Sequence, residues 1–250
     1  MQSNGPHVSK MPRRQTHRGL APKDERLFAA RQLPALSAAV ADLCWLLDHG
    51  YAPRSSSELV GNRHNLIARQ RMAVVRCACS SGAATHRLSR QLDASQIAVR
   101  ELWLDRYNVL TVLESALAGG VVLLGRDGCC RDVAGIHRRY RKVNETISVL
   151  RMVGEFCAAA TVSCCHWWLD KPVSNSGRLK ALILEVASLE KWNMQVDLAF
   201  NPDGVLAKCN HVVATSDSAI LDRCRNWVNM TRTIIERCIP DARVVDLSNA

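Results

Sequence analysis

Short apolar runs alternate with longer helical segments after Gly82, and this rhythm constrains the fold more than any other feature of the sequence. Such alternation is typical of a mainly parallel sheet flanked by helices. We therefore predict an α/β domain over residues 100–250, with helices on both faces of its sheet. The expected strands are Glu101–Leu104, Val121–Leu124, Cys164–Leu169, Met194–Phe200, His211–Thr215 and Arg243–Leu247.

The expected helices between these strands lie near Val109–Leu117, Asn144–Ala160, Gly177–Trp192 and Ser218–Cys238. Only the link around residues 201–204 is too short for a helix. The apolar residues of Met194–Phe200 alternate with polar ones, which predicts a strand that either runs antiparallel or lies at the edge of the sheet.

The N-terminal part of the chain is typical of a small basic all-helical domain, which we place at residues 23–95 behind a flexible basic arm at residues 1–22. Asp24 is a candidate N-cap, and apolar residues at helical spacing continue to Gly50, with Pro34 dividing them into two helices. Ser55 and Glu58 have the spacing of a capping box, which predicts a further helix reaching Cys79.

Charge is distributed unevenly along the chain. Residues 1–100 carry 15 Lys and Arg against 6 Asp and Glu, whereas the remaining residues carry 18 against 17. We therefore expect an anionic partner, with nucleic acid ahead of an acidic protein or a membrane surface. The predicted phosphate contacts are Arg63, Arg69, Arg71 and Arg76. A second basic cluster, at residues 137–142, is a weaker candidate, and a merely solvated basic surface is the alternative.

The 11 cysteines show no CxxC spacing, and their odd count and apolar surroundings argue against a disulfide framework. We expect reduced, buried thiols in a cytoplasmic protein without a signal peptide. No apolar run is long enough to span a bilayer, so no membrane partner is expected. A metal bound by Cys77, Cys79, His64 and His86 is an alternative with unusual spacing.

An aspartate follows each of the first five predicted strands: Asp105, Asp127, Asp170, Asp203 and Asp217. Ligands of open α/β sheets bind at the carboxyl ends of the strands, so these side chains should converge there. Aspartate is also common in turns and caps; Asp127-Gly128 is a turn signal and Asp217 could cap a helix. Converging carboxylates repel one another unless a cation neutralises them, and oxygen ligands suit Mg²⁺ or Mn²⁺. The predicted catalytic and metal-binding residues are Asp105, Asp127, Asp170 and Asp217, with Asn108 as a catalytic partner and Asp132 as a weaker candidate ligand.

A second candidate site follows the third strand. Ser174, Asn175 and Ser176 lie where a helix begins, and exposed amides there could hold a phosphate or carboxylate, with Arg178 and Lys180 nearby. The Gly-Lys-Ser/Thr of a Walker loop is missing. An ordinary helix start is the alternative interpretation.

Two resemblances extend this interpretation. Residues 104–108, Leu-Asp-Arg-Tyr-Asn, resemble the D-G-x-N turn that opens NYN-type domains of the PIN-like ribonuclease superfamily, with Arg106 in place of Gly. Thr215-Ser216-Asp217 resembles the late T/S-x-D motif of those enzymes. Over most of its length, through residues 59–63 and 69–71, the chain also resembles a family of unassigned activity, domain of unknown function 434. The resemblance implies a PIN-like or Rossmann-like domain behind the helical one.

Together these features favour a metal-dependent nuclease that grips nucleic acid, RNA in preference, with its basic module and hydrolyses phosphodiester bonds. One alternative is a non-catalytic nucleic-acid-binding or scaffold protein. The other is a metal-dependent phosphatase or nucleotidyl enzyme acting on a small phosphorylated ligand, held by the loop at residues 174–177.

Overall fold

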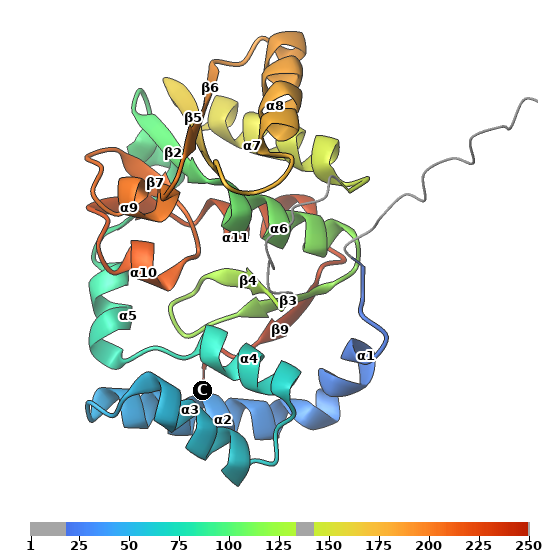
Figure 1. Ribbon diagram of the computed structural model, residues 1–250, viewed down its shortest axis with the longest axis vertical. Coiled ribbons are helices and arrows are strands. Elements are labelled where there is room, and N and C mark those ends of the chain that lie inside the picture. Colours follow the sequence, from blue (N-terminus) through green and yellow to red (C-terminus); the bar gives the residue numbers. More distant parts are fainter. Residues whose placement is uncertain (1–18, 134–142, 250) are drawn as a thin grey trace, which may run out of the picture.

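A six-stranded sheet, all of whose strands are parallel, forms the centre of the computed structural model, in the order β1-β8-β7-β2-β5-β6 (Figure 1). The structure describes residues 19–133 and 143–249. The α/β class and the helix-flanked parallel sheet are therefore confirmed. The strands of this central sheet are β1 (Gln91–Leu92), β2 (Glu101–Asp105), β5 (Cys164–Asp170), β6 (Met194–Ala199), β7 (Val212–Ala214) and β8 (Asn226–Val228).

Helices cover both faces of the central sheet because alternate side chains of its strands are apolar on both sides. Leu102, Leu104 and Trp167 pack into one apolar core, against α6 (Arg106–Leu117), α7 (Thr146–Ala159), α8 (Ser176–Glu190) and α11 (Met230–Cys238). On the other face, a smaller core around Val213 and Trp227 packs under α9 (Pro202–Leu206) and α10 (Ser218–Leu221).

Two predicted strands belong to a second sheet. This sheet has three strands in the order β4-β3-β9, made of β3 (Val121–Leu124), β4 (Cys130–Asp132) and β9 (Arg243–Asp246). Placing β3 and β9 in the central sheet was wrong, because Val121, Leu123 and Val245 pack into an apolar core with the N-terminal helices. The hairpin between β3 and β4 turns at Gly128, whose φ of 74° suits glycine.

The chain between Ser218 and Cys238 is not one helix. It forms α10, then β8, then α11, because Trp227 and Val228 are buried and pair with the neighbouring parallel strands β7 and β1. The link after β6 does contain a short helix, α9, capped by the side chain of Asn201. Strand β6 lies at the sheet edge, as one of the two expectations had it, but it runs parallel to β5.

The N-terminal region is helical, as predicted, with different boundaries. It contains α1 (Asp24–Leu27), a 3₁₀ turn at Ala30–Gln32, α2 (Leu33–Asp48), α3 (Pro53–Arg63), α4 (Ala68–Cys77) and α5 (Ser81–Leu88), and a further 3₁₀ turn at Ala94–Ile97 precedes β2. Pro34 lies in the first turn of α2, where its missing N–H costs nothing.

Two cap predictions for this region were wrong. Helix α3 begins at Pro53, and the Ser55 hydroxyl donates to the Ala52 carbonyl instead of capping a helix. The chain breaks between α3 and α4, where Asn65 has a φ of 50°. Asp24 caps no helix, because its carboxylate binds Arg69.

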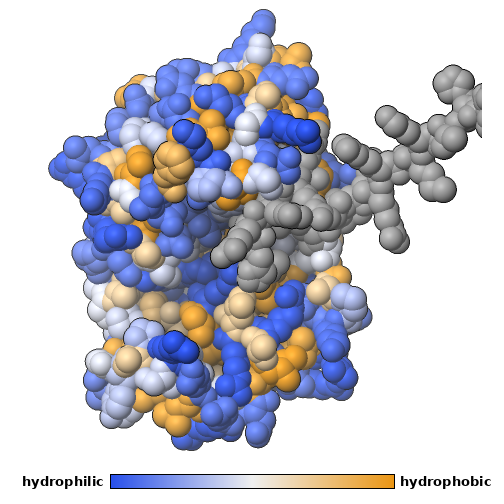
Figure 2. Space-filling model, viewed as in Figure 1, coloured by the Kyte–Doolittle hydropathy of each residue, from blue (hydrophilic) through white to orange (hydrophobic). Residues whose placement is uncertain are grey.

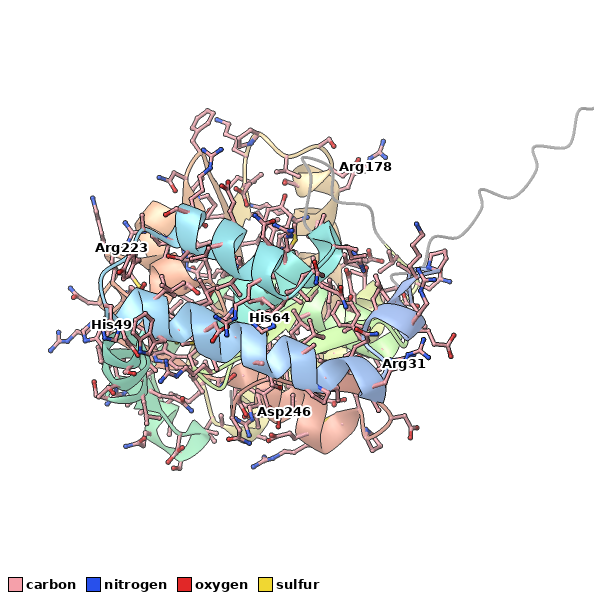
Figure 3. The ribbon with its side chains drawn as sticks, turned by 90° about the horizontal axis from the view of Figure 1, so that it is seen from below. Arg31, His49, His64, Arg178, Arg223 and Asp246 are labelled. Atoms are coloured by element: carbon pink, nitrogen blue, oxygen red, sulfur yellow. The ribbon has the colours of Figure 1, made fainter. Side chains whose placement is uncertain are left out.

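Figure 1 shows the three-stranded sheet between the central sheet and the N-terminal helices, and Figure 3 shows these helices from below, with His64 between them. The small sheet shares its apolar core with residues such as Leu36 and Val40 of α2. The two regions predicted as separate domains are therefore joined by a common apolar core.

All 11 cysteines are free, and 9 of them are buried, as expected for reduced thiols. Among the described helices, none combines the length and the apolar content that crossing a membrane would need. Two predictions fall outside the described residues: most of the basic arm, residues 1–18, and the basic cluster at residues 137–142.

Candidate active site

A cleft of about 990 Å³ lies between the carboxyl ends of the central strands and the N-terminal helices. Figure 2 shows the molecule hollowed there, with hydrophilic residues inside the hollow. Among the described residues, six aspartates line it, and four of them come from the central sheet's strand ends and the segments after them: Asp105 at the end of β2, Asp170 at the end of β5, Asp203 in α9, and Asp217 after β7. The carboxyl ends of the parallel strands thus bring Asp105, Asp170 and Asp217 to one cleft, as predicted.

Asp105 is the most deeply buried of these carboxylates, with 4% of the residue exposed. Its Oδ2 accepts hydrogen bonds from Asn108 Nδ2 at 2.5 Å and from Thr215 Oγ1 at 2.8 Å. Burial, which disfavours the charged form, and the charges of Asp203 and Asp217 outweigh these bonds and raise the pKa of Asp105 to about 6. Asp105 therefore titrates close to neutral pH, as a general acid or base would.

The loop after β7 connects Asp105 to Asp217. The Thr215 hydroxyl that donates to Asp105 also accepts the backbone N–H of Asp217, at 3.0 Å. Asp217 Oδ1 accepts the backbone N–H groups of Ala219 and Ile220, at 2.8 and 3.1 Å, so this carboxylate caps α10. The capping role foreseen for Asp217 is real, and it fixes the carboxylate at the rim of the cleft.

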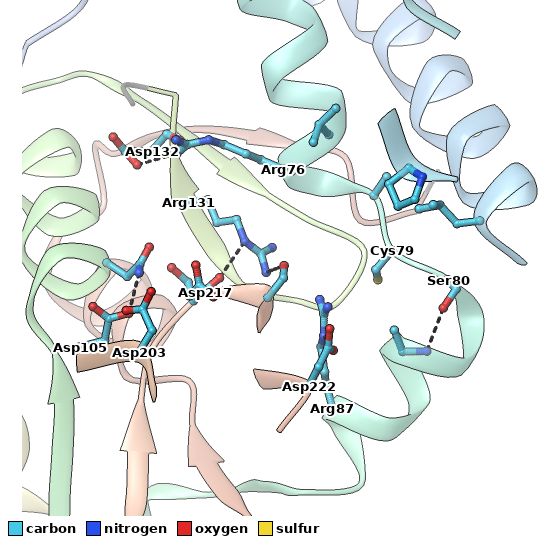
Figure 4. A pocket seen from close by; sticks show the side chains of 18 of the residues that line it. Arg76, Cys79, Ser80, Arg87, Asp105, Arg131, Asp132, Asp203, Asp217 and Asp222 are labelled. Carbon is cyan, nitrogen blue, oxygen red and sulfur yellow. Dashed lines mark hydrogen bonds and ion pairs between the residues drawn. The ribbon is translucent and has the colours of Figure 1, made fainter. Parts of the chain in front are cut away.

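Asp203 and Asp170 complete the cluster. Figure 4 shows Asp203 beside Asp105. Desolvation and the neighbouring charge of Asp203 raise the pKa of Asp170, and Arg106 opposes this rise. Desolvation and the charge of Asp217 raise the pKa of Asp203. Asp203 therefore interacts with all three other carboxylates. Asp203 has the same strand-end signal in the sequence as the other aspartates, although the predicted ligand set does not include it.

The acidic cluster is not a closed metal site. Within residues 19–133 and 143–249, no three His, Cys, Asp or Glu side chains stand close enough together to hold a metal ion. This includes the alternative built on Cys77, Cys79, His64 and His86. His64 instead bonds Asp42 Oδ2, at 2.7 Å.

Because the pKa of Asp105 is raised in the folded protein, the stability of the fold should depend on pH. The folded-state pKa of about 6 lies above the ordinary 3.8, so ionising Asp105 opposes folding as pH rises from about 4 to 6, by up to about 3 kcal/mol. We measure the melting temperature of the metal-free protein. The difference between Asp105→Asn and wild type should be more favourable to the variant at pH 7 than at pH 4. The exposed control Asp241→Asn should behave as wild type at both pH values. Equal stability changes at both pH values for Asp105→Asn would contradict the prediction.

Asp127 lies outside the acidic cluster, because β3 belongs to the second sheet. Its buried carboxylate accepts hydrogen bonds from Arg131 at 2.8 and 2.6 Å and from Arg87 at 2.5 Å. Burial alone would raise the pKa of Asp127, but the two guanidinium groups outweigh it and lower the pKa to about 2. Arg131 Nε also donates to the Ser216 carbonyl, at 2.9 Å, so this network supports the loop that carries Asp217.

Asp132, the weaker candidate ligand, does line the cleft, from β4. Its Oδ1 accepts from Arg76 Nη1 at 2.8 Å, and the same nitrogen donates to the Asp132 carbonyl. This ion pair ties α4 to the small sheet against which it packs.

The predicted phosphate loop lies beside the cleft and does not line it. Ser176 is buried and donates through Oγ to the Asp170 carbonyl, at 2.6 Å. Asn175 adopts the left-handed conformation, with a φ of 75°, at the start of α8. Ser174 and Arg178 are exposed, and Lys180 Nζ lies 4.0 Å from Asp197 Oδ1. This loop therefore contacts Asp170 through the hydrogen bond from Ser176 to its backbone carbonyl.

The predicted phosphate-binding arginines differ in their contacts. Arg69 forms a two-pronged ion pair with the buried Asp24, including Nη2 to Oδ2 at 2.6 Å. Arg71 donates to the Leu66 carbonyl and to Asn62, at 2.7 and 2.9 Å. Arg63 is 74% exposed, with Nε 3.3 Å from Asp42 Oδ2. Of the four predicted contacts, Arg63 has the side chain most available to a partner.

Comparisons with known proteins identify a family and no activity. The family model described as "Domain of unknown function (DUF5616)" matches residues 94–233, and the one described as "Protein of unknown function (DUF434)" matches residues 35–90. The latter confirms the predicted domain-434 resemblance. The chain is 27% identical over 192 residues to Uncharacterized protein MJ0935 of Methanocaldococcus jannaschii, covering 75% of this chain and 89% of that protein. No solved structure matches the chain.

Proposed function

The chain belongs to the family described as Domain of unknown function (DUF5616), and we propose that it hydrolyses phosphodiester bonds of nucleic acid, RNA in preference, with a bound divalent cation. The observation that carries the proposal is the convergence of Asp105, Asp170, Asp203 and Asp217 in one large cleft. Like charges in one cleft destabilise the fold unless a cation or protonation neutralises them, and clusters of this kind are common at functional sites.

The carboxylates have the donor chemistry that Mg²⁺ or Mn²⁺ requires. Mg²⁺ keeps several waters and binds one or two carboxylates together with substrate phosphate, so a closed set of three side chains is not needed. Asp203 would hold the ion with Asp105 or Asp217, because all three carboxylates line the same part of the cleft (Figure 4). Such an ion supplies activation of water and stabilisation of charge on a phosphoryl oxygen.

The two motifs that resemble NYN-type nucleases meet at one atom, Asp105 Oδ2, which accepts hydrogen bonds from both Asn108 and Thr215. The same hydrogen bonds hold the carboxylate in one orientation. This contact supports a PIN-like active site, because the first and last motifs of that pattern lie far apart in the sequence and are joined here by hydrogen bonds to one carboxylate.

Cleavage of a labelled single-stranded RNA in Mn²⁺ and in EDTA tests the proposal. We expect cleavage in Mn²⁺ that EDTA abolishes, together with little hydrolysis of mononucleotides. RNA binding without cleavage would favour a non-catalytic binding protein. Hydrolysis of mononucleotides alone would favour an enzyme of small phosphorylated ligands.

The basic N-terminal region gives a separate test of the nucleic-acid partner. Arg63→Glu should weaken binding of all RNA sequences alike and lower the salt dependence by roughly one unit of slope, because an exposed phosphate contact is lost. Its melting temperature should stay near that of wild type, because exposed ion pairs contribute little to stability. Arg69→Glu should instead lower the melting temperature, because the buried carboxylate of Asp24 would lose its partner and face a second negative charge. Unchanged affinity and salt slope for Arg63→Glu would remove this face from the proposed interface.

A further inference from the structure

Part of the lining of the cleft is apolar. It comes from the N-terminal helices and includes Leu43, Leu47, Tyr51, Pro53 and Val75, which we call the apolar wall. Figure 2 shows hydrophobic residues along the lower rim of the hollow, opposite its hydrophilic interior. One cleft therefore offers two kinds of chemistry: carboxylates that can hold a cation, and an apolar surface.

Tyr51 is the aromatic residue of this wall, and no apolar partner covers its ring fully. The residue is 56% exposed although it lies in a cleft. Its position is fixed by the turn that ends α2: Gly50 has a φ of 77°, the Tyr51 N–H donates to the Leu46 carbonyl at 3.1 Å, and α3 begins two residues later at Pro53. The turn thus holds a large ring in the lining of the cleft that also contains the acidic cluster.

A nucleotide has the same two kinds of chemistry as the cleft. Its phosphate requires positive charge, which a cation at the aspartates would supply, and its base is a flat apolar ring that stacks on aromatic side chains. A paired base is already stacked within its duplex and cannot present its face to a protein ring without being extruded. The cleft volume of about 990 Å³ is at the upper end of what single-ligand pockets need.

We propose that Tyr51 stacks on a base of the substrate, so that the N-terminal helices position an unpaired nucleotide whose phosphate lies at the acidic cluster. This inference rests on the proposed function and assigns to the N-terminal region a role in the cleft itself, besides its charge. Tyr51 is a specificity-determining residue in this scheme, and it takes no part in bond cleavage.

The experiment measures binding of a short fluorescent single-stranded RNA, and of the same RNA with its bases removed, by anisotropy in Ca²⁺. Wild type should prefer the RNA that has bases. Tyr51→Ala should lose that preference by on the order of tenfold, because one stacked base is lost. Tyr51→Trp should retain it, because a larger ring stacks as well.

Trp45 provides the matched control. It is also 56% exposed and lies on the preceding helix, α2, but its ring stacks on His49 at 4.0 Å and it does not line the cleft. Trp45→Ala should bind both RNAs as wild type does. A Tyr51→Ala variant that still discriminates as wild type does, or a wild type that binds neither RNA, would overturn the inference.

Failure of the inference and failure of the proposed function give different results. If Tyr51→Ala loses the preference for bases while the wild type cleaves nothing in Mn²⁺, the stacking role stands and the nuclease proposal falls. If the wild type cleaves RNA and Tyr51→Ala binds and cleaves equally well, the stacking role falls and the nuclease proposal stands.

Discussion

Replacing Asp203 with Asn is expected to slow RNA cleavage in Mn²⁺ by about a hundredfold or more, because metal activation of water and charge stabilisation account for much of the rate of such reactions. Asn has nearly the shape of Asp but no charge, so the fold should survive. Asp105→Asn and Asp217→Asn should lose cleavage to a similar extent. In the Asp217→Asn variant the new amide side chain would still cap α10, since Asn and Asp are equally good N-caps.

These variants need controls that separate chemistry from binding. Asp241→Asn removes an exposed charge outside the cleft lining and should cleave as wild type does. RNA affinity of the Asp203 and Asp105 variants should stay within a few-fold of wild type, because the basic N-terminal face is intact. Cleavage by Asp203→Asn at the wild-type rate would remove Asp203 from the proposed site.

Replacing Asp127 with Ala is expected to destabilise the protein by about 3–5 kcal/mol, measured by denaturant unfolding, because two buried guanidinium groups would lose their shared partner. The side chains of Arg87 and Arg131 are only 4% and 8% exposed. The pKa of Asp127, lowered to about 2 in the folded protein, adds a pH dependence of the wild type. Its contribution to stability is present above about pH 4 and is lost as pH falls towards about 2.

Asp222 is the matched control for Asp127. It pairs with the same Arg87, at 2.7 Å, but its side chain is 45% exposed, so Asp222→Ala should cost no more than about 1 kcal/mol. If Asp127→Ala and Asp222→Ala were equally stable, the buried network would not be a major source of stability. If Asp127→Ala instead kept its stability and lost metal binding, Asp127 would return to the ligand set.

The sequence predicted much of the acidic site because the rule behind it is local. A strand followed by an aspartate can be recognised from a few residues, and parallel strands place their carboxyl ends together. Asp105, Asp170 and Asp217 meet for this reason. Asp127 follows a strand with the same local signal, but sheet membership depends on long-range packing of Val121 and Leu123 against the N-terminal helices. No short pattern carries that information.

The same limit explains the errors in secondary structure. The segment from Ser218 to Cys238 contains enough apolar residues for a helix, yet Trp227 and Val228 form β8 because neighbouring strands offer backbone partners there. The ion pairs of Arg69 and Arg76 could not be predicted from the sequence either, because their partners Asp24 and Asp132 are distant along the chain. A basic helix face can be recognised from sequence, but which of its charges are already paired cannot.

The apolar wall shows a further limit of sequence patterns. Tyr51 follows the end of a helix and looks like an ordinary surface aromatic in the sequence. Only the packing of the N-terminal helices against the small sheet brings it to the cleft that Asp105 also lines.

The most direct test of the account is to locate bound Mn²⁺ by anomalous scattering from crystals of the wild-type protein grown with Mn²⁺. The account predicts an anomalous peak in the cleft, with a carboxylate oxygen of Asp203 and one of Asp105 or Asp217 at metal-ligand distance. A peak elsewhere, or none in the cleft under conditions in which the protein cleaves RNA, would contradict it.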